Sequence, residues 1–181
     1  MGTSDSISVG IDDIAIHFPR LYMDMRDFAD LRGADYGKLN KGLGLKAMAI
    51  PDVHEDTATM GANAVMNLID RNGIDPKNIG RMYLGTESAL DGAKPTATYI
   101  LDMLTQRYSE RYGKECFRNC DVVDMTFACI GAVDALHTTL DGLLVQPIPM
   151  KESVLLFSLI MQNTHLNLQE STLKVQVAVR Y

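Results

Sequence analysis

The fold is decided by residues 121–133, which read DVVDMTFACIGAV. An extended, β-branched run leads here into a segment whose apolar residues recur with helical spacing, which predicts a strand followed by a helix. Cys129 lies at the junction, where unpaired N–H groups and the positive end of the helix dipole favour a thiolate. Cys129 is therefore a candidate nucleophile. The alternative is a structural thiol, since free cysteines are among the most buried residues.

Strand and helix signals alternate along the rest of the chain. Strands are predicted at 6–11, 15–18 and 79–86, and helices at 24–31, at 55–71 and through 99–104, with a glycine-rich loop at 33–45. Asn72-Gly73 supplies a stop signal for the second helix. This alternation predicts an α/β fold with a mostly parallel sheet. In such sheets, ligands bind beyond the carboxyl ends of the strands.

Glu87 is a second candidate. It directly follows the predicted strand 79–86, just as Cys129 follows the predicted strand at 121–127. Neighbouring strands would bring the carboxylate and the sulfur to one pocket. The alternative for Glu87 is a solvated loop residue, since glutamates are usually exposed. His17, beside Phe18 on a predicted strand, is expected to be packed or to have its polar atoms satisfied, and His54, in a polar turn, to be solvated. No local signature of a Ser-His-Asp triad is present.

Composition limits the classes of function. The chain has 181 residues, 46% of them hydrophobic, which suits one domain or half of a larger one. A net charge of −6, without a basic cluster interleaved with aromatic residues, argues against nucleic acid as a partner. Residues 1–8 lack the pattern of a signal peptide and no run of 18 apolar residues occurs, so we expect a cytoplasmic protein without a membrane partner. Cys116 and Cys120 lack the companions of a zinc site, and we interpret both as structural.

Several motifs resemble those of hydroxymethylglutaryl-CoA synthase, a family of the thiolase superfamily. They are GTES at 85–88 and FACIGA at 127–132, supported by VGIDDI at 9–14 and GLGLK at 42–46, and the resemblance covers residues 6–141. Related chain-initiating ketoacyl synthases share the cysteine but not the glutamate, which makes them the alternative enzyme class. The resemblance implies a thiolase-like fold, of which this segment is the N-terminal half of a duplicated αβαβα arrangement.

The resemblance also implies an activity, the condensation of acetyl-CoA with acetoacetyl-CoA to 3-hydroxy-3-methylglutaryl-CoA in the mevalonate route. By that likeness, Cys129 carries the acetyl group as a thioester and Glu87 is the general acid/base, a role worth about 10²–10⁴ in rate. Asp35 and Tyr36 align with a substrate-contacting segment, although Tyr36 replaces a small residue common there. The CoA thioesters are substrates, no cofactor or metal is implied, and a homodimer is expected.

Residues 142–181 form an atypical tail. Family features stop at Asp141, and Gly142 stands where the family usually has tryptophan. If one base is lost from the codons GAY-TGG, which encode Asp-Trp, the remaining bases encode Asp-Gly. The codons of 159–164 and 169–177 can be read in the neighbouring frame as the family-like DYAKY and GEYTQGAG, so we interpret the tail as frame-shifted. In the present reading frame, the residues at 154–160 and 174–179 predict two strands. The family is more than twice as long and has a later substrate-binding histidine, so a non-catalytic remnant is the third alternative.

Overall fold

The computed structural model describes residues 9–127, 130–145, 154–160 and 174–180. Its centre is a sheet with the order β1-β7-β6-β4-β5. The strands are β1 (Gly10–Ile16), β4 (Ile79–Thr86), β5 (Asp121–Met125), β6 (Val154–Ile160) and β7 (Lys174–Arg180). β4 pairs in parallel with both β5 and β6, whereas β7 runs antiparallel to β6 and to β1. The predicted α/β fold is confirmed, with a sheet that is only partly parallel.

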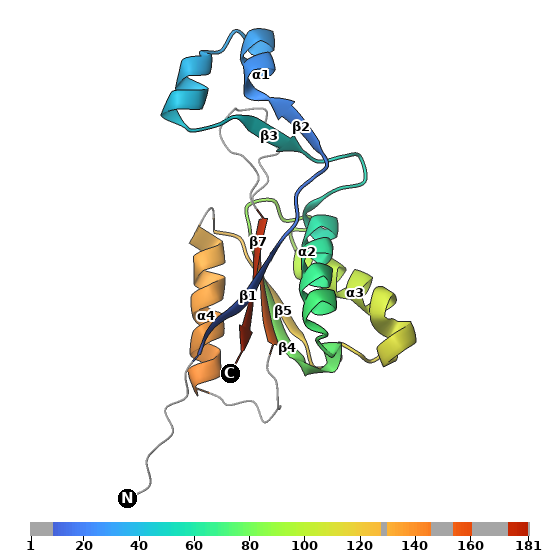
Figure 1. Cartoon of the computed structure of the whole chain (residues 1–181). Helices are drawn as coiled ribbons and strands as arrows, with labels where there is room; N and C mark the ends of the chain where they lie inside the picture. The colour runs from blue at the N-terminus through green and yellow to red at the C-terminus, as the bar shows by residue number, and fades with distance from the viewer. Residues whose placement is uncertain (1–8, 128–129, 146–153, 161–173, 181) are drawn as a thin grey trace, which may run out of the picture.

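Helices cover both faces of this sheet (Figure 1). α2 (Thr57–Asn72) and α3 (Thr96–Tyr112) lie on one face, and α4 (Gly131–Val145) lies on the other. The larger core forms between α2, α3 and the sheet, where Leu68, Leu84 and Ile100 are fully buried. A short 3-10 turn, η2 (Pro76–Asn78), leads from α2 into β4. Among the described residues, no helix combines the length and apolar character needed to cross a membrane.

A small unit lies between β1 and α2 in the chain. It contains β2 (Leu21–Asp24), α1 (Met25–Arg32), the π-helical turn η1 (Lys38–Gly42) and β3 (Ala47–Ile50), with β2 and β3 antiparallel. Met25, Phe28 and Leu39 give it a core of its own. β1 runs toward this unit, so it lies beyond the end of the sheet at which β4, β5 and β6 also finish (Figure 1).

Most predicted elements agree with the structure. β4 has the predicted bounds, α1 begins after an Asp24 cap, and α2 ends at Gly73 in the left-handed region with φ 60°. The two segments predicted at 6–11 and 15–18 are wrong in detail, because one strand, β1, runs through Asp12 and Asp13 by means of a bulge. Residues 6–8 lie outside the described residues.

Two further boundaries differ from the predictions. The expected loop at 33–45 contains η1, whose Leu39 anchors the turn in the core of the small unit. β5 ends at Met125 instead of Phe127, whose side chain is exposed. The positions of apolar residues in glycine-rich or strand-like runs thus predict the ends of helices and strands only approximately.

Candidate functional site

The two strands that precede the candidate residues end side by side. β4 and β5 are parallel neighbours, with Gly85 opposite Met125. Glu87 follows the last residue of β4, and its side chain is exposed. Cys129 lies outside the described residues, between Phe127 and the start of α4. The adjacency of the two strands agrees with the sequence, whereas the pairing of Glu87 with Cys129 stays a prediction.

Two glycines allow the first turn of α4 to lie directly on these strand ends. A Cβ on Gly85 would stand 2.4 Å from the Cα of Ala132, and a Cβ on Gly131 would stand 2.3 Å from the carbonyl oxygen of Met125. Any side chain at either position would therefore force the helix and the strands apart. Gly85 precedes Glu87 by two residues and Gly131 follows Cys129 by two, so the contact joins the segments that carry both candidates.

The residue after Glu87 is held by two buried threonines. The N–H of Ser88 donates to Oγ1 of Thr86 at 3.0 Å. Oγ1 of Thr57, the first residue of α2, donates to the carbonyl oxygen of Ser88 at 2.8 Å. Both threonines are essentially inaccessible to solvent. The backbone beyond Glu87 is thus attached to β4 and to α2 at once.

The rest of the loop after β4 is attached to the start of α3. The N–H of Leu90 donates to Oγ1 of Thr96 at 2.9 Å, and the carboxylate of Asp91 accepts from the N–H of Ala93 at 2.8 Å and from the hydroxyl of Tyr99 at 3.0 Å. The bond from Ala93 and then that from Tyr99 hold the pKa of Asp91 below its usual value. The loop is therefore ordered by contacts within the chain.

Asp124 of β5 caps α3 from the side. Its carboxylate accepts from the N–H groups of Thr96 and Ala97, the latter at 2.9 Å. The residue before the helix is Pro95, which makes no side-chain cap bond, so Asp124 satisfies N–H groups that would otherwise lack a partner. This cap ties α3, and the loop attached to it, to the strand that leads toward Cys129.

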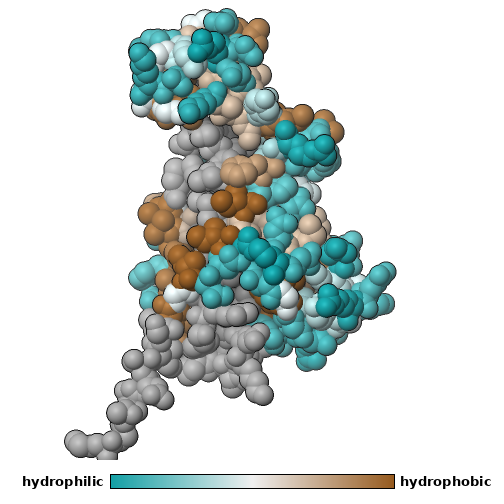
Figure 2. Space-filling view, in the orientation of Figure 1, coloured by the Kyte–Doolittle hydropathy of each residue, from teal (hydrophilic) through white to brown (hydrophobic). Residues whose placement is uncertain are grey.

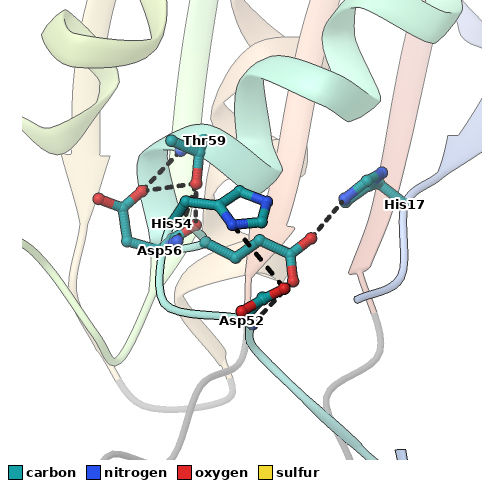
Figure 3. A network of polar contacts seen from close by, with 6 residues as sticks. His17, Asp52, His54, Asp56 and Thr59 are labelled. Atoms are coloured by element: carbon teal, nitrogen blue, oxygen red, sulfur yellow. Dashed lines mark hydrogen bonds and ion pairs between the residues drawn. The ribbon is translucent and has the colours of Figure 1, made fainter. Parts of the chain in front are cut away.

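The start of α2 carries a capping box, shown in Figure 3. A carboxylate oxygen of Asp56 accepts from the N–H of Thr59 at 2.7 Å, and Oγ1 of Thr59 accepts from the N–H of Asp56 at 2.8 Å. This reciprocal pair fixes the first turn of the helix. Thr57, which holds Ser88, lies inside that turn.

The two segments that link the small unit to the sheet meet at Glu55. Figure 3 shows His17 of one segment and Asp52 of the other. Oε1 of Glu55 lies 3.6 Å from Nε2 of His17, just beyond β1, and Oε2 accepts from the N–H of Asp52 at 3.0 Å. His17 is largely buried, as predicted, and the side chain of His54 is 75% exposed, also as predicted. His54 contacts Asp52 at a distance of 3.8 Å.

Asp35 and Tyr36 lie on the small unit between α1 and η1. Asp35 is exposed, and its carboxylate accepts from the N–H of Gly37 at 2.8 Å. The guanidinium of Arg26 stacks over the ring of Tyr36 at 4.8 Å from its centroid. These contacts are internal to the small unit, so the proposed substrate role of both residues stays a prediction.

The two described cysteines are free thiols on the face away from α4. Cys116 is buried in the larger core and Cys120 packs against its edge. Burial raises the pKa of both thiols, which keeps them protonated at neutral pH. Within the part of the chain that the structure describes, no group of three or more His, Cys, Asp and Glu side chains could hold a metal ion.

Sequence reasoning missed the residues that hold the loop after β4. Thr57 and Thr86 had no visible signal, because a threonine at a helix start or strand end is ordinary there. Asp124 did have one, since a carboxylate in the middle of an apolar strand needs a partner when it is partly buried. Its partners, at the start of α3, could be found only in three dimensions.

Comparisons with known proteins agree on one family. The family model described as hydroxymethylglutaryl-coenzyme A synthase N terminal matches residues 6–147. A hydroxymethylglutaryl-CoA synthase of Haloferax volcanii is 44% identical over 130 residues, 71% of this chain and 28% of that protein. Hydroxymethylglutaryl-CoA synthase A of Dictyostelium discoideum is 34% identical over 133 residues, 74% of this chain and 26% of that protein. The chain thus spans little more than a quarter of the length of these curated relatives.

Solved structures share the arrangement over more of the chain. MvaS in complex with 3-hydroxy-3-methylglutaryl coenzyme A superposes with a TM-score of 0.78 at 29% identity, covering 94% of this chain and 39% of that one. Such a score over nearly the whole chain shows that the sheet and its helices are arranged as in that protein.

Proposed function

This chain belongs to the hydroxymethylglutaryl-CoA synthase family, and we propose that it carries the acyl-transfer half of a site that condenses acetyl-CoA with acetoacetyl-CoA. The product would be 3-hydroxy-3-methylglutaryl-CoA, in the mevalonate route. Cys129 is the proposed nucleophile and Glu87 the proposed general acid/base. The expected setting is cytoplasmic.

One observation carries the proposal: α4 rests on the end of β4 with no side chain between them. The backbone of Ala132 lies 2.4 Å from the position that a Cβ on Gly85 would take. That contact joins the segment leading out of β4, with Glu87, to the segment leading into α4, with Cys129. It also supports a thiolate, because the N-terminus of α4, a helix of 15 residues, begins two residues after Cys129.

The proposed chemistry uses these two groups in sequence. The thiolate of Cys129 attacks the carbonyl carbon of acetyl-CoA, the thiolate of CoA leaves and takes a proton, and an acetyl thioester forms on the protein. The carboxylate of Glu87 then removes a proton from the acetyl methyl group. The resulting carbanion adds to the ketone carbon of acetoacetyl-CoA, and Glu87 returns the proton to the new alkoxide. Water finally hydrolyses the thioester and releases the product.

Asp35 and Tyr36 are proposed to contact the CoA thioester substrates. The small unit that carries them lies beyond the carboxyl ends of β4 and β5, which is the side of the sheet where ligands bind in α/β proteins. MvaS is known in complex with 3-hydroxy-3-methylglutaryl coenzyme A, which supports a CoA thioester as the ligand class.

A homodimer is proposed through the sheet. β5 is an edge strand in the order β1-β7-β6-β4-β5, and among the described strands only β4 pairs with it, which supports pairing of its outer edge with a second copy. Size-exclusion chromatography with light scattering measures this directly, and a monomer at every concentration would contradict it.

The reading frame after Asp141 is a separate proposal. We propose that Gly142 and the following residues are read out of frame; the family model ends its match at residue 147. Sequencing the gene across codons 141 and 142 tests this. Codons that cannot encode tryptophan and the family-like stretches in the neighbouring frame would overturn it.

Incubation with acetyl-CoA followed by peptide mass spectrometry tests the function. The peptide that contains Cys129 should gain one acetyl group, and Cys129→Ala should gain none. Cys120→Ala is the matched control, because its thiol has a raised pKa and lies away from the proposed site. It should be acetylated at Cys129 as the original chain is.

The outcome also separates the alternatives. No acetyl group on Cys129 would leave a non-catalytic remnant. Acetylation that is followed by decarboxylative condensation with a malonyl thioester, but not by addition to acetoacetyl-CoA, would indicate an enzyme of the ketoacyl synthase class.

A further inference from the structure

The peptide groups that follow Glu87 are held by side chains from two different elements. Oγ1 of Thr86, at the end of β4, accepts from the N–H of Ser88 at 3.0 Å. Oγ1 of Thr57, at the start of α2, donates to the carbonyl oxygen of Ser88 at 2.8 Å. The first bond fixes the peptide group between Glu87 and Ser88, and the second fixes the peptide group after Ser88.

Both hydroxyls are buried, with 0% of Thr57 and 1% of Thr86 exposed. A buried hydroxyl is costly unless it is hydrogen-bonded, and valine would fill the same space without that cost. Each hydroxyl is instead hydrogen-bonded to the backbone of Ser88.

Thr57 is itself firmly held. It lies in the first turn of α2, inside the capping box of Asp56 and Thr59 (Figure 3). Glu55, which directly precedes Asp56, contacts both Asp52 and His17. The segment that anchors Ser88 is thus connected to both links of the small unit. Because these contacts fix the first turn of α2, the Thr57 hydroxyl in that turn can hold the loop after β4 in one position.

We propose that Thr57 and Thr86 are positioning residues that fix the backbone of Glu87 for proton transfer. The inference rests on the proposed role of Glu87 as general acid/base. Glu87 is exposed, and the two threonine bonds hold the peptide groups that directly follow it. A general base has to stay within about 0.5 Å of its productive position, and a misplacement of about 1 Å costs about 10² in rate.

The first test measures the backbone without any need for turnover. In Thr57→Val the amide hydrogens of the segment 86–90 should exchange about tenfold faster, as expected when one hydrogen bond of about 1.4 kcal/mol is lost. Thr86→Val should do the same for Ser88. Thr105→Val is the matched control, because the Thr105 hydroxyl also donates to a backbone carbonyl at 2.8 Å, but within α3.

The second test measures the proton transfer itself. The acetylated chain is held in D₂O, and exchange of the acetyl methyl hydrogens on Cys129 is followed by mass spectrometry. Thr57→Val should slow this exchange by about 10² while the acetylation of Cys129 is unchanged, and Thr57→Ser, which keeps the hydroxyl, should restore it. Thr105→Val should exchange as the original chain does.

The outcomes separate this inference from the proposed function. If Thr57→Val matches Thr105→Val in both measurements, or loosens the backbone without slowing methyl exchange, the positioning role is wrong. If Glu87→Gln leaves methyl exchange unchanged, Glu87 is not the base and the positioning role fails with it. If Cys129 is never acetylated, the proposed function fails at its first step, and faster amide exchange alone then shows whether the threonines hold the loop.

Discussion

The two faces of the central sheet are covered to different degrees. On one face, α2 and α3 enclose a continuous core that includes Leu68, Ile79 and Ile100, all fully buried. On the other, α4 forms a smaller cluster around Tyr83, Ala135 and Leu143. The first face therefore supplies most of the described apolar burial, and the second carries the proposed chemistry at its upper end.

Exposed apolar side chains are found on the α4 side. Asp13 and Ala15 of β1 contact α2, so strand alternation turns Ile14 and Ile16 toward the other face, where each remains 44% exposed. Val133 of α4 is 55% exposed. Figure 2 shows this apolar surface as a row along β1 and beside α4. On this face, the position of α4 therefore depends more on the close backbone contact at Gly85 than on burial of apolar side chains.

Truncating a leucine on each face should give the largest effect and test the comparison directly. Leu68→Ala should lower the free energy of unfolding by about 3–5 kcal/mol, because its cavity lies in the middle of a large core. Leu143→Ala should cost about 2 kcal/mol, because the last turn of α4 can move to fill the space. Urea unfolding followed by circular dichroism measures both. An equal or larger cost at Leu143 would contradict the comparison.

A methyl group at Gly85 should break the close contact on the α4 side. The Cβ of Gly85→Ala would stand 2.4 Å from the backbone of Ala132, which cannot move as a flexible side chain can. We expect a loss of about 1–3 kcal/mol in unfolding free energy, and a loss of acetylation at Cys129 as α4 is displaced. Gly92→Ala is the control, since its Cβ would meet nothing within 4 Å. Undiminished acetylation in Gly85→Ala would show that the contact is not needed.

The closeness of this contact could not be predicted from sequence. Gly85 and Gly131 read as ordinary members of a strand end and a helix start, and only their meeting with Ala132 and Met125 gives them a role. By contrast, the apolar spacing that ends at Asn72-Gly73 fixes the end of α2, because left-handed glycine caps depend on local sequence alone. The end of α2 was therefore predicted correctly, and the contacts of Gly85 and Gly131 were missed.

The candidate site divides in the same way. Strand order was needed to bring the end of β4 beside the end of β5, and sequence alternation was enough to suggest it. Thr57, one of the two threonines that hold Ser88, is 31 positions away from Ser88 in the sequence. No local pattern predicts such a contact. Positioning residues are thus harder to predict than the residues that they position.

Removing a buried hydroxyl on the α2 and α3 face should have a smaller effect that depends on pH. The hydroxyl of Tyr108 donates to a carboxylate oxygen of Asp70 at 2.7 Å and joins α3 to α2. Tyr108→Phe should cost about 1–2 kcal/mol in unfolding free energy at pH 7. Thermal unfolding of both proteins at several pH values measures this, with Tyr112→Phe as a control on the same helix.

The pH dependence has a definite sign. Burial, and then the bond to Asp70, raises the pKa of Tyr108 above the value of about 10 of an unfolded tyrosine. The folded state therefore keeps this proton where the unfolded state loses it, so stability is complete below about pH 10 and falls as the pH rises further. Tyr108→Phe should show a shallower alkaline loss than the original chain. An unchanged slope would mean that Tyr108 does not link α3 to α2 in this way.

The smallest effect is expected on the exposed part of the α4 face. Val133→Ala removes a side chain that is already 55% exposed, so the unfolding free energy should change by less than about 0.5 kcal/mol. The same substitution at Val65, which is fully buried on α2, should cost about 2 kcal/mol. The pair holds the substitution constant, so urea midpoints compare an exposed position on the α4 face with a buried position on the α2 face. A cost at Val133 as large as that at Val65 would mean that the α4 face is covered in solution, by a second copy or by residues outside those described, and would remove the distinction between the two faces.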